Sequence, residues 1–306
     1  MKLEGVHHVT AITGLAQENV DFYAGTLGLR MVKKTVNQDD PTVYHLFYAD
    51  EQGSAGSDIT FFEYPGARPG RAGDGMVHTV AWRVASHEAL GFWEQRLGDA
   101  GAPVERGEAA LAFSDPEGLR QELRISTVSD PPLLADHPEV PKEAALQGFD
   151  GVRAYSSRPD ASRGLLEALD FEPAGDGWEA RGGSRGGLYA YDEPPDERGA
   201  AGAGTVHHVA WASEIDEHER WRARATAAGA QPTPVIDRFY FRSVYFREPS
   251  GVLFEIATLG PGFTADEPLE TLGERLSLPP DYERLREQIE ATVKPLHNPR
   301  VAAGRG

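Results

Sequence analysis

Short segments in which apolar residues alternate with others recur along the chain. The clearest begin at Val6, Val77 and Val206, and a weaker one begins at Gly148. An alternation with a period of two is typical of a β-strand that buries one face. The four segments therefore predict four strands, each of which opens a separate unit of the chain.

A helix-like pattern follows each of these predicted strands. Apolar or helix-favouring residues spaced three or four apart indicate helices, and they lie at 20–27, 90–97, 165–169 and 221–229. Further strand-like pieces then close the units, at 53–65, 113–125, 186–195 and 246–258. The chain thus predicts four units with the order β-α-β-β-β.

A stretch with four prolines, 127–147, separates the first two units from the last two. Prolines at this density favour a linker. The sequence therefore predicts an α+β fold with one domain at 1–126, the linker, a second domain at 148–262 and a tail at 263–306. Within the tail, 281–294 has the pattern of a surface helix that ends before Pro295.

Composition narrows the chemistry. The 306 residues include no cysteine, which excludes disulfides and thiolates, so a metal would need His, Asp or Glu ligands. The formal net charge of −18 opposes a phosphate backbone, so nucleic acid is not an expected partner. No stretch reaches the roughly 20 apolar residues of a membrane span, and the N-terminus lacks an apolar signal segment. We expect a soluble cytoplasmic protein with no membrane partner.

The motif VHHV occurs twice, at 6–9 and 206–209, in a chain with ten histidines. Neighbouring side chains of a strand point to opposite faces, so one His of each pair can face a shared cavity. Glu255 lies on a strand-like run among apolar residues, where a carboxylate is costly unless it is paired or binds a cation. Two histidines and one carboxylate form the face on which non-haem Fe(II) oxygenases bind substrate and O₂. The pattern favours a metal site.

Other residues of these chemical types are interpreted differently. Glu122 takes the place of Glu255 in the second unit, but Thr79 stands where a ligand His would be, so Glu122 is expected to be structural. His45 lies on an aromatic strand and is expected to be core or pocket lining. Arg238 and Tyr245 shortly precede Glu255, where an Arg can hold a developing anion and a Tyr can donate a proton.

Four segments together resemble the vicinal oxygen chelate superfamily, and within it the ring-cleaving dioxygenases that act on hydroquinones. They are GVHHVTAITG at 5–14, VKKTVNQDDPTVYHLFYADEQGSAG at 32–56, VHHVAWA at 206–212 and RSVYFREPSGVLFEIAT at 242–258. The resemblance covers nearly the whole chain, including the tail at 262–280. It implies four βαβββ modules arranged as two vicinal-oxygen-chelate domains, with a cup-shaped sheet around a metal site.

The resemblance also implies which residues form the site. It selects the second His of each pair, so that Fe(II), with Mn(II) as the alternative, is bound by His8, His208 and Glu255. Residues that match the family's other site positions are expected to handle protons, stabilise an oxyanion or support the site; they are His207, Arg238, Tyr245, His7 and Thr10.

The implied reaction opens a hydroquinone (1,4-dihydroxybenzene) ring with O₂, so the expected partners are a small aromatic diol and O₂, and a homo-oligomer is a further expectation. One alternative is a catechol extradiol dioxygenase. In those relatives the third and fourth units supply the ligands, whereas this third unit has Asp150 and Gly151 at the matching positions.

A second alternative is a glyoxalase-type isomerase or lyase, which usually needs a second Glu ligand. Aligning Gly56 with Gly251 places Thr60 opposite Glu255, and Thr cannot serve as that carboxylate. A slip of three residues would bring in Glu63 instead, and we favour Thr60 because it keeps the glycines aligned. A ligand-sequestering protein is disfavoured by the chain's length and by the intact His-His-Glu set.

Overall fold

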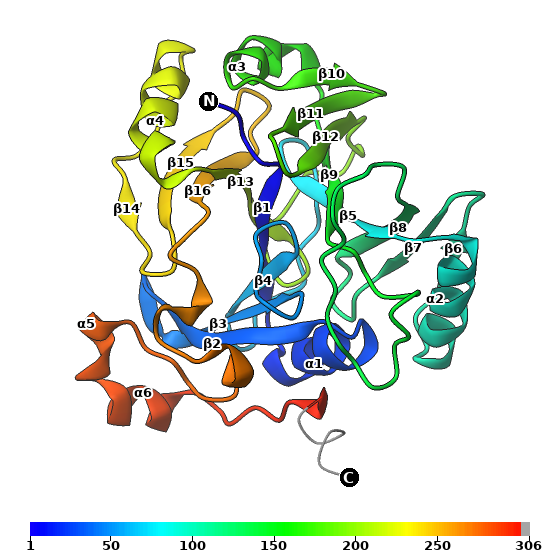
Figure 1. Cartoon of the computed structure of the whole chain (residues 1–306). Helices are drawn as coiled ribbons and strands as arrows, with labels where there is room; N and C mark the ends of the chain where they lie inside the picture. The colour runs from blue at the N-terminus through cyan, green and yellow to red at the C-terminus, as the bar shows by residue number, and fades with distance from the viewer. Residues whose placement is uncertain (301–306) are drawn as a thin grey trace.

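The computed structural model describes residues 1–300, which form two curled eight-stranded sheets side by side (Figure 1). Two βαβββ modules lie before the linker. The first consists of β1 (Val6–Thr13), α1 (Ala16–Val20), the π-helical turn η1 (Asp21–Thr26), β2 (Arg30–Asn37), β3 (Asp40–Ala49) and β4 (Asp58–Glu63). The second consists of β5 (Val77–Val84), α2 (His87–Asp99), β6 (Glu105–Arg106), β7 (Ala110–Ser114) and β8 (Arg120–Ile125).

Two more modules of the same order follow the linker. The third consists of β9 (Phe149–Tyr155), η2 (Pro159–Ser162), α3 (Arg163–Ala168), β10 (Glu172–Ala174), β11 (Gly177–Arg181) and β12 (Gly186–Asp192). The fourth consists of β13 (Val206–Ser213), η3 (Ile215–Glu217), α4 (His218–Ala227), β14 (Ile236–Asp237), β15 (Arg242–Arg247) and β16 (Leu253–Thr258). The predicted α+β class and its four β-α-β-β-β units are confirmed.

Each sheet combines modules from both sides of the linker. The strand order is β14-β15-β16-β13-β1-β4-β3-β2 in one sheet and β10-β11-β12-β9-β5-β8-β7-β6 in the other. Modules one and four therefore share a sheet, as do modules two and three. The first pair is joined by antiparallel β1 and β13, in which Val9 lies opposite Val209. This pairing brings the two VHHV segments together. The domain boundaries predicted at 126 and 148 stay a prediction.

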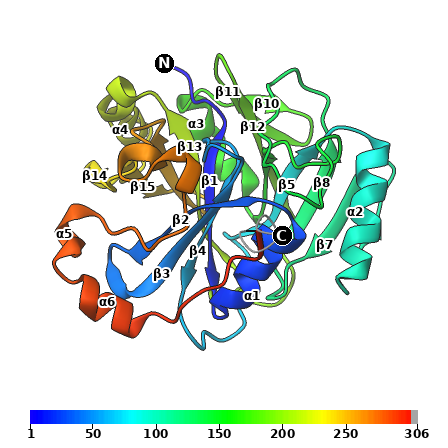
Figure 2. The ribbon, with the colours of Figure 1, turned by 60° about the horizontal axis from the view of Figure 1, so that its bottom comes forward.

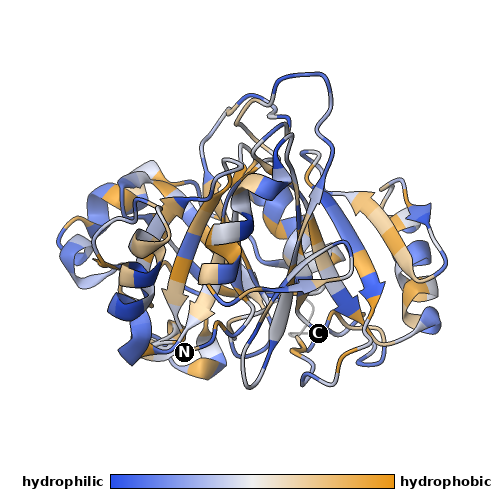
Figure 3. Ribbon diagram, turned by 90° about the horizontal axis from the view of Figure 1, so that it is seen from above, coloured by the Kyte–Doolittle hydropathy of each residue, from blue (hydrophilic) through white to orange (hydrophobic). Residues whose placement is uncertain are grey.

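Hydrophobic residues gather along the strands (Figure 3), where the core lies between the sheets and their outer helices. Helix α2 shows how the sequence pattern produces this packing. Leu90, Trp93 and Leu97 are fully buried, and Ser86 caps the helix by accepting a hydrogen bond from the Ala89 N–H. No helix within residues 1–300 is long and apolar enough to cross a membrane.

The tail passes along β2 and β3 and closes that side of the first sheet (Figure 2). It contains η4 (Phe263–Ala265), η5 (Leu269–Thr271), α5 (Pro280–Glu283) and α6 (Arg286–Thr292). The prediction of a single helix at 281–294 is thus wrong, because the helix is interrupted between α5 and α6. At the break, Leu285 packs with Val36 and Ile289, and the Tyr282 hydroxyl donates to the carbonyl of Gln38.

Candidate metal centre and substrate pocket

Three side chains from three adjacent strands meet on the concave face of the first sheet. His8 comes from β1, His208 from β13 and Glu255 from β16. The Nε2 atoms of the two histidines are 3.2 Å apart, and Glu255 Oε2 lies 3.2 Å from His8 Nε2 and 2.9 Å from His208 Nε2. The strand pairing therefore brings together the three residues that the family resemblance selected.

These atoms fit a metal ion better than they fit one another. All three residues are buried, yet within residues 1–300 Glu255 Oε2 has no well-formed hydrogen bond, although two ring nitrogens lie close to it. Ligand atoms about 2.1 Å from one ion and at right angles to each other would be about 3.0 Å apart. The spacing is that of one face of an octahedron, and within residues 1–300 this group has the donor set of a divalent cation.

The first histidine of each pair supports the second from behind. His7 Nε2 lies 3.1 Å from the carbonyl oxygen of Thr258 and must donate to it, because a carbonyl only accepts. Burial, and then the neighbouring His8, lowers the pKa of His7 to about 3, so its ring is neutral and Nδ1 is an acceptor. His8 Nδ1, 2.9 Å away, then carries the proton. The Nε2 lone pair of His8 is left free for a metal.

The second pair repeats only part of this arrangement. His207 Nδ1 lies 2.7 Å from His208 Nδ1, but the His207 ring is exposed and lies at a second hollow with Met76 and Arg247. His208 lines this second hollow as well, but His207 is not among the lining residues of the pocket that also contains His8, Arg238 and Tyr245. Its ring contacts that pocket through two of the lining side chains, His208 and Phe62, whose ring centroid lies 5.6 Å from that of His207.

The carboxylate of Glu255 is held in its ionised form. Burial alone would raise the pKa of Glu255, but the imidazoles of His8 and His208 outweigh it and hold this pKa well below its usual range. Burial also lowers the pKa of His208, so that ring stays neutral. The Ser243 hydroxyl donates to Glu255 Oε1 at 2.5 Å and fixes the carboxylate plane. The sequence analysis did not identify Ser243 as a site residue, although Ser243 lies two residues before Tyr245 and on the same face of β15.

The strand register decides which residue of module one corresponds to Glu255. In β13 and β16, Ala210 lies beside Glu255, and in β1 and β4 the equivalent Thr10 lies beside Thr60. Glu63 instead pairs with Thr13 and is not in the metal group of the described residues. A hydroxyl therefore occupies the place of a fourth ligand, and it contacts the Thr10 hydroxyl at 2.9 Å.

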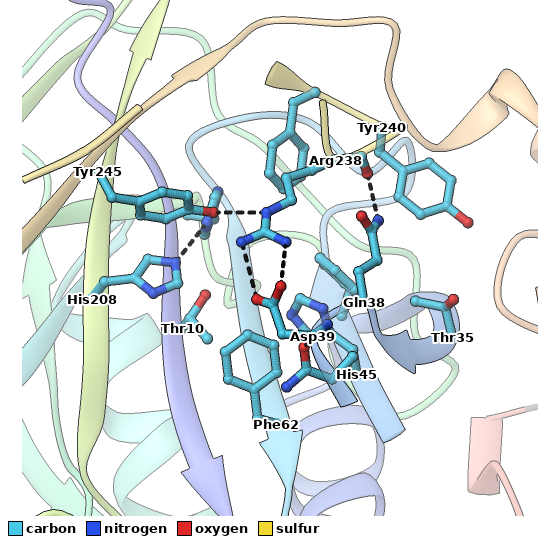
Figure 4. Close-up of a pocket in the computed structure, with 14 residues that line it drawn as sticks. Thr10, Thr35, Gln38, Asp39, His45, Phe62, His208, Arg238, Tyr240 and Tyr245 are labelled. Carbon is cyan, nitrogen blue, oxygen red and sulfur yellow. Dashed lines mark hydrogen bonds and ion pairs between the residues drawn. The ribbon is translucent and has the colours of Figure 1, made fainter. Parts of the chain in front are cut away.

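A pocket of about 450 Å³, partly open to solvent, lies against these residues (Figure 4). One part of its wall carries the two histidines of the candidate metal centre, and several of the remaining side chains are aromatic. The lining residues are His8, Thr10, Thr35, Asn37, Gln38, Asp39, His45, Phe47, Phe62, His208, Arg238, Tyr240, Phe241 and Tyr245. A pocket with aromatic walls beside a candidate metal centre has the surroundings that a small aromatic ligand requires.

Arg238 and Tyr245 face this pocket together. Arg238 Nε donates to the Tyr245 hydroxyl at 3.4 Å, and its two terminal nitrogens contact the Asp39 carboxylate at 3.1 and 3.2 Å (Figure 4). Gln38 donates to the Arg238 carbonyl at 2.8 Å. The loop between β2 and β3 thus holds Arg238 at the pocket mouth. Sequence reasoning missed Gln38 and Asp39, because loop residues follow no periodic pattern.

The matching positions of the second sheet form no such centre. His78 Nε2 contacts Asp192 at 2.9 Å and its ring stacks on Tyr155, while Glu122 pairs with Arg124 at 2.9 Å. Within residues 1–300 the group of metal-ligating type is the one in the first sheet. The sheet of modules one and four therefore carries the candidate metal centre, and the described part of the sheet of modules two and three carries no equivalent group.

Comparison with known proteins gives consistent matches. A model of the Glyoxalase/Bleomycin resistance protein/Dioxygenase superfamily matches residues 5–123 and 165–256. The chain is 44% identical to "Putative ring-cleaving dioxygenase MhqO" of Bacillus subtilis, over 96% of this chain and 97% of that protein. It is 33% identical to "Chlorohydroquinone/hydroquinone 1,2-dioxygenase" of Sphingobium indicum, over 95% and 96%. A crystal structure of a "putative dioxygenase" from Bacillus subtilis matches with a TM-score of 0.90 and 42% identity, over 97% and 98%.

Proposed function

The chain belongs to the Glyoxalase/Bleomycin resistance protein/Dioxygenase superfamily, and from that premise we propose that it is a ring-cleaving dioxygenase that opens hydroquinones with O₂. The observation that carries the proposal is the buried face of His8, His208 and Glu255 beside an aromatic pocket. Three protein ligands leave coordination positions free for a substrate oxygen and for O₂. A metal centre with all positions filled by protein could not bind both.

Iron(II) is the metal that we assign to this centre, with manganese(II) as the alternative. Two neutral imidazoles and one carboxylate are the donor set of non-haem Fe(II) oxygenases, and the chain has no cysteine that would favour softer metals. The metal supplies the joint binding of a phenolate oxygen and O₂. One carboxylate against two positive charges leaves a net positive centre, which favours an ionised phenol.

The side chains around the centre position the ring and manage its charge. Phe47, Phe62 and Phe241 line the pocket and offer apolar faces against which a flat ring would pack. The Arg238 guanidinium supplies positive charge for an oxyanion. Burial and the nearby Glu255 raise the pKa of Tyr245, so its hydroxyl stays protonated and can donate. His7 and Thr10 act indirectly, by holding His8 and the wall beside it.

The register of Thr60 supports dioxygenase chemistry over glyoxalase-type isomerisation. The latter usually needs a fourth protein ligand, and the Thr60 side chain at that position is hydrogen-bonded to the Thr10 hydroxyl instead. The catechol alternative shares the metal set and differs in the substrate, so it must be separated by measurement. The similarity to "Chlorohydroquinone/hydroquinone 1,2-dioxygenase" supports the para-diol.

The test is oxygen uptake by protein loaded with Fe(II) in the absence of air, with hydroquinone and catechol as parallel substrates. We expect uptake with hydroquinone and a ring-opened product by mass spectrometry. Glu255→Gln should abolish uptake. Its counterpart in the second sheet, Glu122→Gln, is the matched control and should retain uptake. Uptake with catechol alone would assign the chain to the extradiol type, and no uptake with either diol would refute the proposal.

A further inference from the structure

His45 is a histidine of the pocket wall that is not a member of the metal group. Its ring lies between the rings of Phe47 and Phe62, with centroid distances of 3.9 and 4.4 Å. Its Nε2 atom lies 2.9 Å from the Thr60 hydroxyl, which in turn contacts the Thr10 hydroxyl at 2.9 Å. Because Thr10 is two residues from His8 on the same face of β1, this chain of contacts fixes the imidazole relative to the metal centre.

The internal repeat shows that this arrangement has a counterpart at the metal. In module four, Tyr245 pairs with Glu255 across β15 and β16, and Ser243 pairs with the residue two positions on. In module one, Phe47 pairs with Thr60 across β3 and β4, and His45 takes the place of Ser243. The Ser243–Glu255 contact therefore corresponds to the His45–Thr60 contact.

The two modules use this pair of positions in opposite ways. In module four a hydroxyl holds a carboxylate that points at the metal. In module one a hydroxyl replaces the carboxylate, and it holds an imidazole that lines the same pocket. Thr60, which stands at the position without a metal ligand, thus supports the imidazole of His45, and an imidazole can both donate and accept a hydrogen bond.

His45 is suited to a neutral hydroxyl ligand. Burial, together with the nearby His8 and His208, lowers the pKa of His45 well below its ordinary value, so the ring is uncharged. Its Nε2 is engaged by Thr60, and within residues 1–300 no hydrogen bond reaches its Nδ1. By contrast, the side chain of Asn37, also in the pocket wall, is engaged by the Tyr64 hydroxyl and the Asp39 N–H.

We propose that His45 binds the second hydroxyl of the substrate and so makes the pocket specific for a 1,4-diol. This inference rests on the proposed function. The two hydroxyls of a 1,4-diol lie at opposite ends of the ring, so a metal can hold only one and the wall must meet the other. A 1,2-diol can direct both hydroxyls to the metal and leaves His45 without a partner, which costs binding because a polar group stays desolvated.

The test compares hydroquinone with 4-methylphenol, which has nearly the same shape and lacks the second hydroxyl. Binding to the Fe(II)-loaded protein is titrated without O₂, so that affinity is measured apart from turnover. For the unaltered chain we expect the affinity for hydroquinone to exceed that for 4-methylphenol by about tenfold or more. In His45→Phe the two affinities should become equal, and His45→Gln should retain part of the difference.

Two further variants keep the outcome decisive. If His45→Phe does not fold, Thr60→Val removes the hydroxyl that fixes the imidazole and should reduce the difference. Thr35→Val tests a second pocket hydroxyl, which is buried and has no hydrogen-bond partner in the described part of the chain. A preference that survives His45→Phe, or that disappears in Thr35→Val instead, would overturn the role of His45 alone. If the unaltered chain binds neither compound and takes up no O₂ with hydroquinone, the proposed function itself fails.

Discussion

The Nε2 atoms of His8 and His208 lie 3.2 Å apart although 200 positions separate them in the chain. The contact depends on the pairing of β1 with β13, in which Thr10 lies opposite His208 and His8 opposite Ala210. Each is the second histidine of a VHHV motif, and the Nδ1 atom of each contacts the ring of the histidine directly before it in the chain. The centre is therefore built by two modules that begin with the same motif and meet at the middle of one sheet.

Replacing His208 by Ala should remove metal binding. Loss of an outer-shell group costs about 10–100-fold in metal affinity, so loss of a ligand should exceed about 100-fold. Metal content after dialysis, measured by atomic emission, checks this. The control is His78→Ala, which changes a histidine of the second sheet that contacts Asp192. Equal metal content in His208→Ala and the unaltered chain would contradict the ligand assignment.

Replacing His7 by Leu should weaken metal binding without removing a ligand. The Nδ1 of His8 would lose its acceptor, and its ring would no longer be held in the tautomer that leaves Nε2 free. A fall of about 10–100-fold in metal affinity is expected. Titration of the metal-free protein measures it, and His7→Gln should recover part of the loss. An unchanged affinity would show that His7 merely fills space.

Asp58→Asn should raise the free energy of unfolding, and this gain over the unaltered chain should be larger at higher pH. Asp58 is buried, and neither of its carboxyl oxygens has a hydrogen-bond partner among the residues that the structure describes. Burial, and then Asp50, raises the pKa of Asp58 well above its usual range. The folded state therefore holds this proton above pH 3.8, where the unfolded chain releases it, so stability falls as pH rises toward the folded pKa. Each pH unit in that window contributes about 1.4 kcal/mol.

Urea unfolding of Asp58→Asn and of the unaltered chain at pH 5 and pH 8 measures this difference. The variant should gain more free energy of unfolding at pH 8 than at pH 5. Asp130→Asn is the matched control, because the Asp130 carboxylate accepts hydrogen bonds from Arg83 and Arg181 at 2.7 Å and its pKa is held below its usual range. That control should lose stability. The same difference at both pH values would refute the raised pKa of Asp58.

Lys33→Met should destabilise the tail and loosen the pocket. The Lys33 ammonium is fully buried, contacts the carboxylates of Asp266 and Glu267, and lies 4.9 Å from the centroid of the Tyr240 ring. Removing it takes the ammonium from Asp266 and leaves Glu267 with Arg275, whose Nε lies 3.5 Å from Glu267 Oε1, at a cost of about 3 kcal/mol. Because Tyr240 lines the pocket, the KM for hydroquinone should rise as well.

Thermal unfolding and steady-state kinetics of Lys33→Met check the two effects. The double variant Lys33→Met with Glu267→Gln removes a negative charge along with the positive one, and it should recover part of the lost stability. Lys2→Met, at an exposed lysine that pairs with Asp170 at 3.6 Å, is the control and should change Tm little. A Tm for Lys33→Met close to that of the unaltered chain would contradict the role assigned to this cluster.

The sequence by itself determined the four modules and the chemistry of the site. Period-two segments and helical runs identify elements because those patterns depend only on residues close in the chain. The absence of cysteine and the repeated VHHV limited a metal site to histidine and carboxylate. Within each pair, periodicity left His7 and His8 equivalent, and the family resemblance selected His8.

Only the tertiary structure decided which modules pair and which distant groups complete the site. The pairing of modules one and four follows from contacts between strands 200 positions apart, which no local pattern encodes. The register of Thr60, the Ser243–Glu255 contact and the break of the tail helix at Leu285 arise in the same way. Asp39 and Gln38 lie in a loop, where packing against Arg238 rather than periodicity gives each side chain its place.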